Sequence, residues 1–179
     1  MEQASGKPAA PGEWVLLTYR LPREPSTPRS TVWRKLRRLG VVQISDGLVA
    51  LPADARTREQ LDWIAVEVRE AAGTANVWLA RPTSQAHERE LATTMAADRA
   101  AEYEAVREQA QATAGLDDAR RERALRRLRG ELRRIRRRDF FPPAERDAAV
   151  AAVEQLSAGP RAHESLAGTA PVPQAGERR

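Results

Sequence analysis

The chain contains no cysteine, which excludes disulfide bonds, thiolate catalysis and cysteine-ligated metal centres. Its two histidines, His87 and His163, are a poor supply of metal ligands. No apolar run approaches the roughly twenty residues that cross a bilayer, and residues 1–13 lack the apolar segment of a secretory signal. We therefore expect a cytoplasmic protein with no membrane span, no metal site and no cofactor.

Aromatic residues are also scarce, at 4%, although hydrophobic residues reach 41% of the 179 residues. Alanine supplies much of that hydrophobic content, which favours a small sheet-containing core with long helices attached. The net charge of +5 is consistent with an anionic partner such as nucleic acid or an oxyanion. An arginine-rich composition also arises in a GC-rich genome, so charge alone says little about function.

Four short apolar runs predict β-strands in the first half of the chain. They are Trp14–Tyr19, Val41–Ile44, Leu48–Leu51 and Ala75–Ala80. Asp46 and Gly47, between the second and third runs, are a strong hairpin signal. The first strand therefore stands apart from a predicted hairpin, with room for a helix between them.

Two amphipathic stretches between these strands predict helices. The first begins at Thr27 and Pro28, a cap followed by proline at the first helical position, and ends at Gly40. The second is expected to begin with a capping box of Thr57 and Gln60. The order β-α-β-β-α-β over residues 13–82 is the ferredoxin-like arrangement, an α+β fold with both helices on one face of an antiparallel sheet.

The other face of this sheet must also be covered. Trp14, Trp63 and Trp78 are candidates for that second surface. A dimer partner or the later helices of the chain would cover it.

Residues 83–157 predict a helical extension. One long helix is expected from about Ser84 to near Ala114 and a second from about Asp117 to Arg138, followed by a final helix. The second helix carries a narrow apolar seam that suits a helical hairpin, made of Leu125, Leu128, Leu132 and Ile135. The terminal segments 1–12 and 158–179, rich in proline, glycine and alanine, are expected to be disordered.

Basic residues form two clusters on these predicted helices. The first lies on the polar face of the first helix and consists of Arg34, Lys35, Arg37 and Arg38. The second belongs to a segment with eleven arginines from Arg120 to Arg138 against five acidic residues, and its C-terminal turns hold Arg133, Arg134, Arg136 and Arg137. Both clusters could contact DNA phosphates. The first also fits the solvated face of an amphipathic helix, and the second also complements a helix dipole.

A third cluster lies between the first strand and the first helix. Arg20 and Arg23 stand near the predicted helix N-terminus, where guanidinium and backbone N–H groups together can hold an anion. A surface loop with two exposed arginines is the alternative. No Ser/His/Asp set, glycine-rich phosphate loop or paired-carboxylate motif is present, so we expect no catalytic residues and no enzymatic activity.

The sequence resembles the N-terminal domain of the ChrB chromate-resistance regulators of bacteria, over most of residues 14–156. The matching segments are WVLLTYRLPREPSTPRSTVWRKLRRLGVV, DGLVALP, EQLDWIAVEVREAAG and IRRRDFFPP. The resemblance implies a role in chromate-responsive regulation of an efflux operon. Members of the family commonly continue into a C-terminal domain, so we expect this chain to be a stand-alone N-terminal module.

The region of the first strand also looks like the ferredoxin-like core of phenylacetate-type repressors and of the CRISPR-associated Cas2 nucleases. Those nucleases place a metal-binding aspartate at the end of that strand. Here Arg20 follows Tyr19, so a metal-dependent nuclease is the least favoured hypothesis.

The leading hypothesis is a chromate-resistance-type transcriptional regulatory protein that binds DNA nonenzymatically through its arginine-rich helices, as a homodimer. The alternative is a module that senses chromate or a similar oxyanion, or binds another protein, without touching DNA.

Overall fold

The computed structural model describes residues 12–113 and 115–158. Its elements are β1 (Trp14–Arg20), α1 (Thr27–Leu39), β2 (Val42–Ser45), β3 (Leu48–Pro52), α2 (Ala55–Glu70), β4 (Thr74–Ala80), α3 (Gln85–Thr113), α4 (Asp118–Arg136) and α5 (Glu145–Ala158). The predicted α+β class and the order of the elements are confirmed. The segments predicted to be disordered lie outside the described residues, apart from Gly12 and Ala158.

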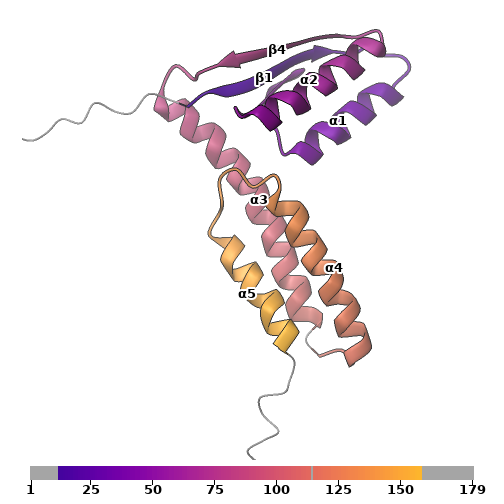
Figure 1. The fold of residues 1–179 in the computed structure, drawn as a ribbon, viewed down its shortest axis with the longest axis vertical. Coiled ribbons are helices and arrows are strands. Elements are labelled where there is room, and N and C mark those ends of the chain that lie inside the picture. Colours follow the sequence, from indigo (N-terminus) through magenta and orange to yellow (C-terminus); the bar gives the residue numbers. More distant parts are fainter. Residues whose placement is uncertain (1–11, 114, 159–179) are drawn as a thin grey trace, which may run out of the picture.

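The sheet has the strand order β2-β3-β1-β4, and all neighbouring strands are antiparallel. Figure 1 shows α1 and α2 side by side on one face of this sheet. Side chains alternate along a strand, so Val15 and Leu17 of β1 point to the helices. Both are fully buried, as are Leu36 of α1 and Leu61 of α2. This is the ferredoxin-like core that the sequence predicts.

The predicted start of α2 is wrong. The N-cap is Asp54, whose carboxylate accepts a hydrogen bond from the Thr57 N–H at 2.6 Å, while the Thr57 hydroxyl accepts one from the Asp54 N–H at 2.9 Å. These hydrogen bonds lower the pKa of Asp54. A capping box is present, but Thr57 is its third helical residue. Aspartate caps better than threonine, and burial of Thr57 against the carbonyl of Pro52 fixes the register.

The second face of the sheet is covered at one end by later segments of the chain. Trp14 is 2% exposed and stacks on Phe141, with ring centroids 5.9 Å apart. Leu91 and Met95 of α3 belong to the same core. Trp78, on the same face, is 56% exposed.

Trp63 does not contribute to this second face. It lies on α2, which covers the first face, and its side chain is 64% exposed because the helix packs through the opposite residues Leu61, Ile64 and Val68. The prediction for Trp63 is therefore wrong, whereas Trp14 and Trp78 do lie on the second face.

The helix α3, 29 residues long, connects the sheet to a bundle with α4 and α5 (Figure 1). The bundle core includes Tyr103 and Val106 of α3, Leu128 and Leu132 of α4, and Val153 of α5. The predicted hairpin of α3 and α4 is therefore completed by α5 into three packed helices. No helix in the described part of the chain is long and apolar enough to cross a membrane.

Candidate anion-binding surface

The segment that follows α4 docks onto the sheet domain. Arg138 donates from Nη1 to the carbonyl oxygen of Arg37 in α1 at 3.4 Å and from Nη2 to Oε2 of Glu102 in α3 at 2.7 Å. Arg56 of α2 donates to the carbonyl oxygen of Arg137 at 3.3 Å. The C-terminal ends of α1 and α4, 101 residues apart at this contact, therefore lie side by side.

Gly40 makes this approach possible. It ends α1 in the left-handed conformation, with φ of 79°, where glycine alone is free of strain. A Cβ atom on Gly40 would lie 2.8 Å from the Cβ of Arg138 and 2.9 Å from Nη1 of Arg99. Both the backbone and the close contact therefore require glycine.

A buried hydrogen bond to α3 also holds the segment that follows α4. The Tyr103 hydroxyl donates to Oδ2 of Asp139 at 2.9 Å, and Arg146 lies 3.8 Å from the same oxygen. Burial, with the neighbouring Asp139 carboxylate, raises the pKa of Tyr103 to about 12. We call the contact of this segment with the end of α1 the junction. Polar contacts hold it to α1 and α2 through Arg138 and Arg56, and to α3 through Tyr103.

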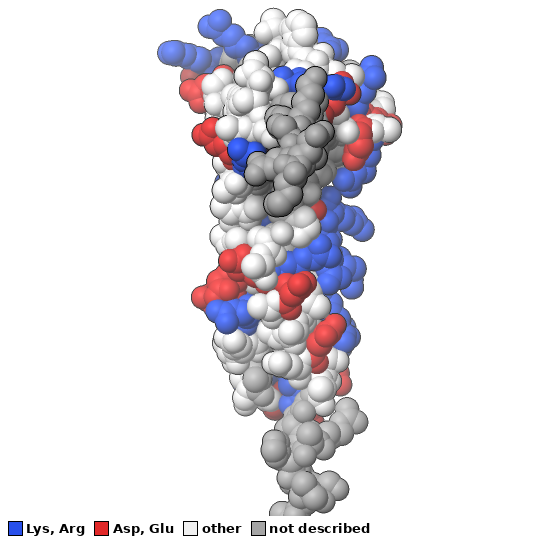
Figure 2. Space-filling view, turned by 90° about the vertical axis from the view of Figure 1, so that its left-hand side faces the viewer, with Lys and Arg blue, Asp and Glu red and all other residues white. Residues whose placement is uncertain are grey.

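The two basic clusters predicted from the sequence meet at this junction. We call their exposed arginines the basic ridge. It consists of Arg34, Arg37 and Arg38 from α1 and of Arg133, Arg134, Arg136 and Arg137 from the end of α4. Figure 2 shows lysine and arginine side chains in a column along one edge of the molecule, from the sheet domain down the bundle.

Most of the ridge has no counter-charge. In the first half of α4, Arg120, Arg121 and Arg126 pair with acidic residues three or four positions earlier. Within the described residues, the guanidinium groups of the seven ridge arginines make no ion pair, and only Arg34 among them makes hydrogen bonds, to Ser30 and Thr31. Unpaired, exposed guanidinium groups are what phosphate contacts require.

Lys35, the remaining member of the first predicted cluster, lies elsewhere. Its Nζ is 2.5 Å from Oε1 of Glu67 on α2, and both side chains are half-buried. This ion pair ties α1 to α2. DNA contact by Lys35 stays a prediction, and Glu67 would compete for its charge.

A cleft of about 620 Å³ lies under the ridge, between α1, β2 and α3. Its charged lining residues are Arg37, Arg38, Asp98, Arg99, Glu102 and Arg138. Arg99 is 6% exposed and donates to Oε1 of Glu102 at 3.1 Å. Sequence reasoning missed Arg99, Glu102 and Arg138, although Leu91, Met95, Arg99 and Tyr103 recur every four residues and so place a cation inside the apolar stripe of α3.

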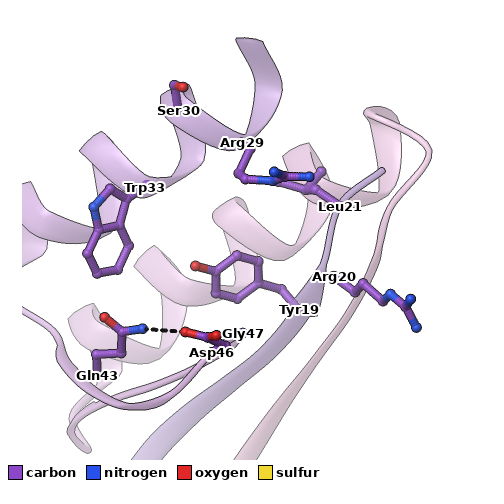
Figure 3. Close-up of a pocket in the computed structure, with 9 residues that line it drawn as sticks. All are labelled: Tyr19, Arg20, Leu21, Arg29, Ser30, Trp33, Gln43, Asp46 and Gly47. Carbon is purple, nitrogen blue, oxygen red and sulfur yellow. Dashed lines mark hydrogen bonds between the residues drawn. The ribbon is translucent and has the colours of Figure 1, made fainter. Parts of the chain in front are cut away.

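A second hollow, of about 740 Å³, lies at the other end of α1 (Figure 3). Tyr19, Trp33, Gln43 and Asp46 line it, and burial together with the Asp46 charge raises the pKa of Tyr19. The guanidinium group of Arg20 points away from the Tyr19 ring (Figure 3).

Arg23 is exposed and does not line this hollow. The cations that line it are Arg20 and Arg29; Arg29 donates to the carbonyl oxygen of Pro22 at 2.9 Å and was not among the predicted site residues. The structure does not bring Arg20 and Arg23 together around an anion, so their role stays a prediction. Within residues 12–113 and 115–158, no group of three or more acidic, histidine or cysteine side chains is placed to hold a metal ion.

Comparison with known proteins places the sequence in one family. A family model described as "Protein ChrB, N-terminal" matches residues 29–167, which include most of α1, the basic ridge and the cleft. Protein ChrB of Cupriavidus metallidurans is 32% identical over 133 residues, which are 72% of this chain and 40% of that relative. No solved structure matches the chain. The chain therefore belongs to the ChrB N-terminal family.

Proposed function

We propose that this chain is a regulatory protein of the chromate-resistance type that acts in the cytoplasm and binds DNA, without catalysis, through the basic ridge. The observation that supports the proposal is the contact of Arg138 with the carbonyl oxygen of Arg37, because it brings the ends of the two arginine-bearing helices side by side. The ChrB family membership supports the regulatory role. The relative is longer than this chain, so this role for the chain itself is part of the proposal.

Helix dipoles alone do not account for the ridge. Cations complement the C-terminal end of a helix, and both α1 and α4 have arginines in their last turns. This stabilisation by the helix dipole does not require the two helix ends to lie next to each other. Placing two cationic ends side by side adds repulsion, which a bound polyanion would offset.

Binding through the ridge has a defined physical signature. Each phosphate that an arginine neutralises releases counterions, so the logarithm of the binding constant falls with the logarithm of salt concentration by about 0.9 per contact. The seven ridge arginines can therefore give a steep salt dependence, whatever the DNA sequence.

We also propose that the protein is a homodimer and that the second copy covers the open part of the sheet. Leu16, Leu48 and Trp78 share this face, and Trp78 is exposed. The same patch on both copies is the usual basis of a twofold interface. Trp78→Glu is expected to give a monomer in light scattering, while Trp63→Glu on α2 leaves the mass unchanged; a monomeric wild-type protein would contradict the dimer.

The experiment that tests DNA binding is a fluorescence-anisotropy titration of duplex DNA from upstream of the protein's own operon, at two salt concentrations, with and without chromate. We expect binding that weakens steeply with salt and that is reduced in Arg34→Gln/Arg37→Gln/Arg38→Gln. The matched control removes the same charge outside the ridge, in Arg58→Gln/Arg81→Gln/Arg89→Gln. Equal affinity of the two triple variants would rule out the α1 part of the ridge. No binding at either salt concentration would instead favour the oxyanion-sensing or protein-interaction module.

A further inference from the structure

The cleft under the ridge contains buried guanidinium groups with unused donors. Arg99, on α3, is more than nine-tenths buried, and its Nε has no hydrogen-bond partner among the described residues. The Nε of Arg138 is also buried and has no partner in the same part of the chain. A buried charged donor without a partner is costly, so these two atoms mark a place where an acceptor is missing.

The carboxylate present is shared between the two arginines. Glu102 accepts from Arg99 with Oε1 at 3.1 Å and from Arg138 with Oε2 at 2.7 Å. One negative charge therefore faces two positive charges at the buried end of the cleft. Both carboxylate oxygens are occupied, and neither serves an Nε.

The whole lining remains positive when every charged group is counted. Arg37, Arg38, Arg99 and Arg138 contribute four cations, and Asp98 and Glu102 contribute two anions. The C-terminal end of α1 adds about half a negative charge. An excess of positive charge is left inside a space of about 620 Å³.

We infer that this cleft binds a tetrahedral oxyanion, which accepts hydrogen bonds from Arg99 and Arg138. The planar guanidinium fork suits the paired oxygens of sulfate-like and phosphate-like anions. The exposed Arg37 and Arg38 at the same cleft supply further charge. The anion is either free in solution or a phosphate of the DNA backbone. The site is distinct from Arg20 and Arg23 and does not depend on DNA binding by the ridge.

An anion in this cleft would act on the junction. Arg138 already connects the end of α4 to the Arg37 carbonyl of α1 and to Glu102 of α3. A ligand held by Arg138 and Arg99 adds a second connection between the same elements. Binding would therefore stabilise the arrangement of the two halves of the ridge.

The first arm of the test uses the full chain without DNA. Thermal unfolding is followed while sodium sulfate replaces sodium chloride at constant ionic strength, and again with inorganic phosphate. We expect a saturable rise in Tm for the wild-type protein. In Arg138→Gln the apparent affinity for sulfate should fall by about tenfold, since charge-assisted hydrogen bonds are lost. Arg137→Gln removes the same charge next to it in the chain, outside the cleft, and should stay within about twofold of wild type.

The second arm distinguishes a DNA phosphate from a free anion. Arg99→Lys keeps the charge but removes the fork, and circular dichroism confirms that the variant folds. If the cleft takes a backbone phosphate, Arg99→Lys weakens duplex binding while the exposed control Arg58→Lys does not, and sulfate gives no saturable shift. A saturable sulfate effect that Arg99→Lys and Arg138→Gln both weaken supports the free anion. The inference is overturned if sulfate acts equally on Arg138→Gln, Arg137→Gln and wild type, as a general salt effect would, and Arg99→Lys leaves DNA binding unchanged.

Discussion

The two basic helices handle their charge differently. In α1, Lys35 pairs across to Glu67 on α2, whereas Arg37 and Arg38 remain unpaired. In α4, Arg120, Arg121 and Arg126 pair with acidic residues near the start of the helix, while Arg133, Arg134, Arg136 and Arg137 have no acidic partner among the described residues. Each helix therefore has unpaired arginines at its C-terminal end, and these are the two ends that the fold brings together. Acidic residues close in the sequence therefore neutralise part of α4, a contact with another helix neutralises Lys35, and the meeting of α1 and α4 places their unpaired arginines side by side.

The largest effect is expected from closing the approach between the two helices. Gly40→Ala places a Cβ 2.8 Å from the Cβ of Arg138 at a φ of 79°, which should lower the free energy of unfolding by about 3 kcal/mol. Urea unfolding measures the change. Gly130→Ala, within α4, is the control, because a Cβ there meets no atom closer than 3.9 Å and should stabilise the helix by about 0.5–1 kcal/mol. Equal stability of the two variants would show that the junction does not require Gly40.

Removing the hydrogen bond between Tyr103 and Asp139 should have the next largest effect on stability. Tyr103→Phe deletes the hydrogen bond to the buried Asp139, which should lower the free energy of unfolding by about 2 kcal/mol. It should also remove a pH dependence. The folded-state pKa of Tyr103 is raised to about 12, above the unfolded value of about 10. Its contribution to stability is therefore complete below pH 10 and is lost as the pH rises toward 12. If the wild type and Tyr103→Phe respond alike between pH 10 and 12, the role of this hydroxyl is contradicted.

Measurements of DNA affinity can compare the α1 half of the ridge with the α4 half. Arg34→Gln/Arg37→Gln/Arg38→Gln and Arg133→Gln/Arg134→Gln/Arg137→Gln should each weaken duplex binding by about tenfold at moderate salt, or about 1.4 kcal/mol. Each should also reduce the salt slope by up to about three. Titrations at several salt concentrations measure both quantities. A loss confined to one variant would show that the duplex follows a single helix and not the joined surface.

The smallest effect is expected for the ion pair that ties α1 to α2. Lys35→Met should change the free energy of unfolding by less than about 1 kcal/mol, because both partners are half exposed. Glu67→Gln, which breaks the same pair, should give a similar value in urea unfolding. If Lys35 contacts DNA, Lys35→Met weakens duplex binding and Glu67→Gln strengthens it; no change in either variant would limit the role of Lys35 to structure.

Much of the fold could be read from the sequence because its signals are local. Asp46 and Gly47 form the predicted hairpin turn between β2 and β3, and Gly40 ends α1 as expected. The start of α2 could not be predicted with the same ease, since Asp54 and Thr57 are both good caps and burial chose between them. Trp63 was misplaced for a related reason, because an exposed tryptophan on a helix resembles a core residue in the sequence.

Only part of the candidate site could be predicted from the sequence. The arginines of α1 and α4 were identified as two clusters, but their meeting depends on Arg138, Glu102 and the docking of Phe141 on Trp14. Sequence spacing carries no information on a contact between residues 101 positions apart. Arg99 was overlooked because a single charge within a helix is usually assigned to the solvent side.

The strands, the helices, their ferredoxin-like order and the arginines at the ends of two helices all follow from the sequence alone. These features come from apolar periodicity, capping and the distribution of acidic residues, all of which act within a few positions along the chain. In contrast, it is the packing of the folded chain that brings the two helix ends together and lets Arg99 and Arg138 share one carboxylate in a cleft. That outcome depends on how α3 crosses from the sheet to the bundle, and packing between distant segments fixes it.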